Sequence, residues 1–138
     1  MIENFTLMKS NFLALLMFFS ALVLHSSEVK AQNLDNISTA IQTGNAKEVA
    51  KFFDNSVEIT VYNSEGAYSK AQGEMVLKDF FTKNPPQSFS LIHKGNSHQG
   101  SQYGIGTLVT GNGNYRTYVY IKQKGNAFFI QEVRFEKD

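Results

Sequence analysis

Residues 103–136 read YGIGTLVTGNGNYRTYVYIKQKGNAFFIQEVRFE, and this stretch decides the fold. Apolar and polar residues alternate over 103–110, 115–124 and 127–136, which predicts three strands. Gly111-Asn112-Gly113-Asn114 and Gly125-Asn126 separate these strands, and such pairs are strong signals of tight hairpin turns. The C-terminal third of the chain is therefore predicted to be antiparallel sheet.

Two helices are predicted upstream, before the first strand. Apolar residues at 34, 37, 40 and 41 recur at helical spacing, with Asn33 or Asp35 as the N-cap and Gly44 at the end. Asn45-Ala46-Lys47-Glu48 resembles a capping box that opens a second, shorter helix. The apolar residues that this second helix is expected to bury are Val49, Phe52 and Phe53.

The middle of the chain predicts one strand, one helix and another strand. Apolar residues alternate over 57–61, and 63–66 is typical of a turn. Ser69 with Gln72 is a second capping pattern, and Pro85-Pro86 stops the helix that it opens. Residues 89–93 then predict a strand. Helices first and strands last indicate an α+β fold, with helices covering one face of an antiparallel sheet.

The two hairpins assign each strand residue to a face of the sheet. With Asn112-Gly113 and Gly125-Asn126 as turn centres, Val119 opposes Gly106 and Glu132. One face is then Gly104, Gly106, Leu108, Thr117, Val119, Ile121, Phe128, Ile130, Glu132 and Arg134. The other is Tyr103, Ile105, Thr107, Val109, Arg116, Tyr118, Tyr120, Lys122, Phe129, Gln131, Val133 and Phe135. A slip of one residue in either turn would exchange the faces.

The first face is small and aliphatic, so we expect the helices to pack there. Its two glycines permit close helix approach or leave a hollow, and Thr117, Glu132 and Arg134 are its candidate pocket-lining residues. Glu132 is the best candidate for an acid on this face, but a neighbouring arginine lowers the pKa of a carboxylate. We therefore interpret Glu132 and Arg134 as an ion pair, and we predict no catalytic residue.

The second face is too apolar to be only a solvated surface. Large amphipathic side chains gathered on one face are typical of an interface. Arg116 among the tyrosines could engage an anionic or aromatic ligand, or lie at the centre of a homodimer interface, and we favour the dimer. The candidate interface residues are Tyr103, Arg116, Tyr118, Tyr120, Phe129 and Val133.

Composition argues against several classes of function. The absence of cysteine excludes disulfides and thiolate zinc sites, and His93 and His98 have no evident third ligand, so no metal or cofactor is expected. A net charge of +1 without any long basic block argues against nucleic acid as a partner.

The first 31 residues resemble an export signal. Lys9 precedes an apolar run over residues 12–24, and Val29-Lys30-Ala31 supplies the small residues of a cleavage site. We expect removal of residues 1–31 to leave one domain over 32–138, periplasmic or secreted, with no membrane anchor and no cysteine for a lipid. Glu3 is out of place in a basic leader, so translation from Met8 rather than Met1 is a second hypothesis.

The order of elements resembles that of the nuclear transport factor 2-like superfamily, which includes ketosteroid isomerase-like enzymes. The local sequence is similar to a family of small exported Bacteroidota proteins, domain of unknown function 4783. The stretches that carry the likeness are Ile41–Ala46 before Phe52-Phe53, Tyr68–Gln72, Phe80-Phe81, His98–Gly100 and Tyr115-Arg116.

This resemblance implies a cone-shaped α+β fold and carries no catalytic motif. We expect a non-enzymatic module that binds a small apolar ligand or a protein. The alternative is an isomerase or hydratase that uses a carboxylate in the cone.

Overall fold

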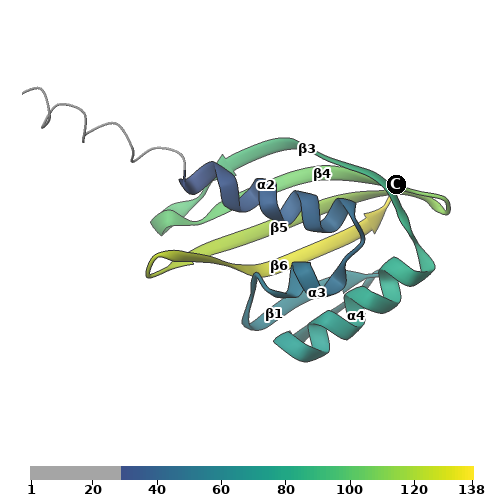
Figure 1. Cartoon of the computed structure of the whole chain (residues 1–138), viewed down its shortest axis with the longest axis horizontal. Helices are drawn as coiled ribbons and strands as arrows, with labels where there is room; N and C mark the ends of the chain where they lie inside the picture. Colours follow the sequence, from purple (N-terminus) through teal and green to yellow (C-terminus); the bar gives the residue numbers. More distant parts are fainter. Residues whose placement is uncertain (1–28) are drawn as a thin grey trace, which may run out of the picture. The chain divides into compact units, whose positions relative to one another are not determined.

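The computed structural model of the protein describes the backbone of residues 29–138 and the side chains of residues 33–138. The expected leader and both candidate start sites lie outside the described side chains. Residues 33–138 form one compact unit, in which the helices lie over one face of a six-stranded sheet (Figure 1). The elements are α2 (Val29–Gln42), α3 (Ala46–Ala50), β1 (Phe53–Val61), β2 (Ser64–Ser69), α4 (Lys70–Lys83), β3 (Pro86–Asn96), the 3₁₀ helix η1 (His98–Gly100), β4 (Gln102–Thr110), β5 (Gly113–Lys124) and β6 (Ala127–Lys137).

The sheet runs in the order β2-β1-β6-β5-β4-β3, so the last strand lies near the middle. The predicted α+β class, with helices packed on a curved sheet, is confirmed. Neighbouring strands are antiparallel except β1 and β6, which run parallel. A parallel pair needs a long crossover connection. The whole chain from β2 to β5 forms that connection here. Within residues 29–138 no helix is long and apolar enough to cross a membrane.

The helix boundaries follow local capping chemistry. Gly44, with φ of +66°, ends the first helical segment as predicted, and the Asn45 side chain accepts a hydrogen bond from the Glu48 amide. Ser69 and Gln72 form the predicted capping box of α4. Two details of the prediction are wrong. The helix α2 begins at Val29, so both proposed N-caps lie inside it, and Phe53 belongs to β1 rather than to the second helix.

The strand β2 was predicted as part of a turn. The actual turn is Tyr62-Asn63, with φ of 53° and 57°, and two left-handed residues close a two-residue hairpin. Tyr-Asn is not a strong signal for this turn, whereas Asn63–Gly66 reads as a loop. The chain after Asn63 instead pairs with β1 from Val61↔Ser64 to Ser56↔Ser69.

The helices approach the sheet closely where glycine permits it. A Cβ atom at Gly73 of α4 would lie 3.0 Å from both Phe53 and Val57 of β1. A Cβ atom at Gly104 of β4 would lie 3.5 Å from Leu34 of α2. The predicted close approach of a helix at Gly104 is therefore present, and the side chains between helices and sheet fill the core.

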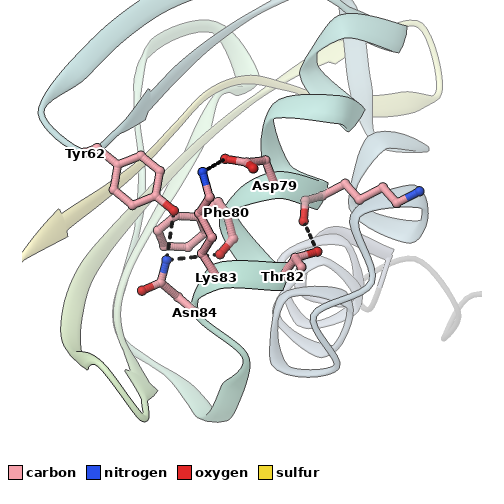
Figure 2. A network of polar contacts seen from close by, with 7 residues as sticks. Tyr62, Asp79, Phe80, Thr82, Lys83 and Asn84 are labelled. Carbon is pink, nitrogen blue, oxygen red and sulfur yellow. Dashed lines mark hydrogen bonds and ion pairs between the residues drawn. The ribbon is translucent and has the colours of Figure 1, made fainter.

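The C-terminal end of α4 is tied to the sheet by the buried Asn84 (Figure 2). Its amide nitrogen donates to the Tyr62 hydroxyl at 3.0 Å and to the Phe80 carbonyl at 3.1 Å. The Tyr115 hydroxyl of β5 donates to its amide oxygen at 2.9 Å. Phe80 itself stacks on Phe135 of β6 with ring centroids 4.6 Å apart. Every polar atom of this buried amide is used, so the network is structural.

The hairpin between β4 and β5 turns at Gly111-Asn112, one residue before the predicted centre. The hydroxyl of Thr110 accepts from the Asn112 amide at 3.1 Å and donates to the Gly113 carbonyl at 2.8 Å, which fixes this turn. Val119 therefore opposes Gly104, and the predicted pairing with Gly106 is wrong. Because the register moves by two residues, every residue of β4 and β5 keeps its predicted face.

Candidate functional site

A β-bulge at Gln131 sets the faces of β6. Near the turn the register is as predicted, with Ile121 opposite Ile130. Beyond it Tyr120 opposes Glu132, so Gln131 is an extra residue on β6. Each residue of β6 after the bulge therefore lies on the face of the sheet opposite to the predicted one.

The bulge separates the three residues that were expected to line one pocket. Glu132 and Arg134 lie on the outer face, the face away from the helices, and not on the inner face with Thr117. Val133, predicted at the interface, is fully buried in the core instead, as is Phe135. The physical reason is that one inserted residue moves every later side chain to the other face.

Thr117 lies on the inner face as predicted, but it meets no open space. It is fully buried, and its hydroxyl donates to the Tyr115 carbonyl at 3.3 Å. Leu108 and Val119 around it are at most 1% exposed. A groove of about 510 Å³ lies outside this core, between the α2–α3 loop and α4.

The outer face carries most of the predicted interface residues. The half-buried ones are Tyr103, Tyr118, Tyr120 and Phe129, and Ile105 beside them is half-buried too. The register places Tyr103 opposite Tyr120 and Ile105 opposite Tyr118. The Tyr103 and Tyr118 rings lie 6.4 Å apart, only 24° from parallel. We call this set the aromatic patch, and it consists of Tyr103, Ile105, Tyr118, Tyr120 and Phe129.

Charged side chains border the aromatic patch on β6 and β5. The Arg134 guanidinium lies 5.0 Å from the centre of the Tyr118 ring, and its Nε donates to the Glu132 carboxylate, as the predicted ion pair requires. The hydrogen bond that Arg134 donates to Glu132 raises the pKa of Arg134. Burial raises the pKa of Tyr118, so its hydroxyl is neutral at pH 7. Arg116, also an interface candidate, is exposed on this face opposite Glu136.

Asp54 is the charged residue that sequence reasoning missed. The alternation over 57–61 predicts a strand that excludes Asp54, but β1 begins at Phe53. The Asp54 carboxylate accepts from the Gln131 amide at 2.8 Å and pairs with Lys124. Hydrogen bonds from Lys124 and then from Gln131 lower its pKa from 3.8 to about 2. Asp54 therefore holds the bulge residue in place.

The described part of the chain contains no cluster of side chains that could bind a metal ion. His93 lies in β3 and His98 in η1. Over the described range, no three His, Asp or Glu side chains gather closely enough to hold a metal ion together.

Comparison with known proteins assigns the family. The family described as "Domain of unknown function (DUF4783)" matches residues 34–136. The chain belongs to the DUF4783 family. No curated protein is significantly similar to it. The family description assigns no activity.

Solved structures of other DUF4783 proteins share the fold. A member from Bacteroides uniformis is 27% identical, with a TM-score of 0.72 over 75% of this chain and 95% of that one. A member from Bacteroides ovatus is 29% identical, with a TM-score of 0.71 over 75% and 93%. An NTF2-like protein of unknown function from Cytophaga hutchinsonii is 6% identical, with a TM-score of 0.57 over 83% and 95%. The predicted DUF4783 membership and NTF2-like fold are thus confirmed.

Proposed function

We propose that this DUF4783 protein is an exported, non-enzymatic interaction module that forms a homodimer through the outer face of its sheet. The observation that carries the proposal is the aromatic patch. Five large side chains lie together on a face that none of the described helices covers, and the Arg134 guanidinium extends the patch at Tyr118. Tyrosine and arginine on a half-apolar surface are typical of the centre of an interface.

The chemistry of the same face argues for binding rather than catalysis. An isomerase or hydratase needs a free carboxylate beside a substrate pocket. Glu132 is held in an ion pair with Arg134 and is not free. Tyr118, with its raised pKa, is not a base at neutral pH. We therefore favour binding over the enzymatic alternative.

Export is supported by the leader pattern alone. Lys9, the apolar run over 12–24 and the small residues at 29 and 31 form the three regions of a cleavable signal. The proposed dimer would then form in the periplasm or outside the cell, from residues 32–138.

The test is self-association of residues 32–138, measured by sedimentation from low to high micromolar concentration. We expect a dimer, and we expect Tyr118→Ala to raise its dissociation constant at least about tenfold, because an aromatic anchor at the centre of an interface is lost. Met75→Ala is the matched control, since Met75 is the most exposed large apolar residue described and lies on α4, away from the patch. A strict monomer at high micromolar concentration, or equal effects of both variants, would contradict the proposal.

A further inference from the structure

The outer face contains a hollow beside the aromatic patch. It has a volume of about 340 Å³ and lies over β2, β1, β6 and β5. The small side chains of Ser56 and Ala67 leave the space open at one side, and the Tyr120 ring borders it at the other. The hollow is large enough for one long side chain. Its lining residues are Ser56, Glu58, Ala67, Tyr120, Gln131 and Glu132.

Two carboxylates lie side by side in this hollow. Glu58 and Glu132 are Cα partners on the parallel strands β1 and β6, and both line the hollow. Glu132 is held from one side by Arg134. Glu58 forms no ion pair with any residue that the structure describes. Like charges on neighbouring strands repel unless a cation lies between them, so the hollow favours a positive group.

The same face supplies a suitable cation, Lys122. Its distance from Tyr120 is comparable to the distance of Glu58 from Tyr120. Lys122 lies two residues along β5 from Tyr120, which is about 7 Å, and Glu58 lies two strands away, which is about 10 Å. Lys122 is exposed, and the described residues offer it no ion pair. A lysine stem also packs well along an aromatic ring while its ammonium reaches a polar site.

The outer face carries both an acidic hollow and a lysine that could fill the hollow of another copy. Such a face is suited to a two-fold symmetric contact between two copies of the chain. In an isologous dimer, residue i of one copy touches residue j of the second, and j touches i. We propose that Lys122 of a second copy enters the hollow, with its ammonium between Glu58 and Glu132, so that two such contacts flank the paired aromatic patches. This inference rests on the proposed homodimer, and it specifies how the two copies recognise each other.

Lys78 provides a charge-matched control for Lys122. It is also an exposed lysine, and it forms no ion pair with any residue that the structure describes. It lies on α4, on the helix-covered side of the sheet and away from the aromatic patch. Reversal at Lys78 changes the net charge of each copy by the same amount as reversal at Lys122, but it should change the dimer much less.

The experiment is a charge exchange, read as the dimer dissociation constant by sedimentation. We expect Glu58→Lys and Lys122→Glu each to raise the constant at least about tenfold, because each places like charges at both contacts. The double variant recreates an opposite-charge pair and should return the constant to within about threefold of the wild type. Lys78→Glu should change it by less than about threefold. Circular dichroism checks that each variant is folded.

The outcomes separate this inference from the proposed function. A wild-type monomer would contradict the homodimer itself. A wild-type dimer that Tyr118→Ala weakens, but that the double charge exchange fails to restore, would overturn the Lys122 contact and leave the homodimer standing. A loss with Lys78→Glu equal to the loss with Lys122→Glu would overturn it as well, because general repulsion would then explain both.

Discussion

Asp54 contributes stability that depends on pH at the residue scale. Its folded pKa, about 2, lies below its ordinary value of 3.8, so the ionised form is the one that the native state prefers. The stabilisation is therefore fully present above about pH 4 and is lost as the pH falls through about 2. Lys124, the main cause of the shift, is 52% exposed, so solvent and salt weaken the pair.

We predict that Asp54→Asn lowers the free energy of unfolding at pH 7 by about 1 to 2 kcal/mol, since it removes the charge that Lys124 pairs with. The difference from the wild type should shrink as the pH falls toward 2. Urea unfolding at several pH values measures both. Asp79→Asn is the control, because the Asp79–Lys83 pair is exposed and should change stability by less than about 0.5 kcal/mol. An unchanged stability of Asp54→Asn at pH 7 would refute the assignment.

The bulge at Gln131 shows what sequence reasoning can detect residue by residue. The apolar residues of β6 that face the core are Phe128, Ile130, Val133 and Phe135. Their spacing is two, then three, then two, and the step of three marks an inserted residue. The alternation before the bulge was predicted correctly. Beyond it, the turn alone could not reveal a slip that Asp54, far away in the chain, holds in place.

At the scale of elements, α4 is the best-specified segment of the chain. The Ser69–Gln72 box satisfies its first amides, and Asn84 satisfies its end while joining it to Tyr62 and Tyr115. Pro85-Pro86 prevents its continuation. All of these signals except the long-range contacts of Asn84 are local in sequence, which is why the helix could be predicted almost to the residue.

We predict that Ser69→Ala lowers the free energy of unfolding by about 1 kcal/mol, because the Gln72 amide loses its side-chain acceptor. Ser64→Ala, at the other end of β2, is the matched control. Ser64 is exposed and caps no helix, so its loss should cost less than about 0.5 kcal/mol. Thermal unfolding of both variants provides the comparison, and equal effects would contradict the capping role.

The strands were predicted less completely than the helices, for a physical reason. The strand β2 has no buried alternating face, since its residues are exposed or only half-buried. The formation of β2 as a strand depends on its pairing with β1 rather than on its own composition. The early start of β1 has the same cause, because Asp54 and Asn55 read as loop residues until Gln131 and Lys124 are brought beside them.

At the scale of the whole molecule, β6 joins two halves of the sheet. The β1–β2 hairpin lies on one side of it and the β5–β4–β3 strands on the other. The core is also continuous, since Phe80 of α4 packs on both Tyr115 of β5 and Phe135 of β6. Neither half can keep its apolar face covered without the other.

We therefore predict that residues 32–138 unfold in a single transition. Circular dichroism of the backbone and tyrosine fluorescence should give coincident urea curves. Hydrogen exchange should give equal opening free energies for the slowest amides of β1 and β4. A separate, earlier transition of β1 and β2 would show that the two halves are independent.

The class of fold could be predicted from the order of elements, but the parallel β1–β6 pair could not. Hairpin turns specify only strands that are consecutive in sequence. Nothing in the sequence near Phe53 indicates that Ile130 will lie beside it. The pairing of β1 with β6 depends on the helices that cover the inner face and on the contact between Asp54 and Gln131. Val133 was placed in the candidate interface for the same reason. The bulge that moves Val133 into the core is held by the long-range contact between Asp54 and Gln131.

The position of β6 also bears on the order of events while the chain is made. The contact from Asp54 to Gln131 spans 77 residues, and the strand that completes the sheet is the last to leave the ribosome. Closing so large a loop is slow. One edge of the β1–β2 hairpin therefore stays unpaired until β6 has been made. This late closure fits the export that we propose, because a chain that has not yet folded can pass through a narrow pore.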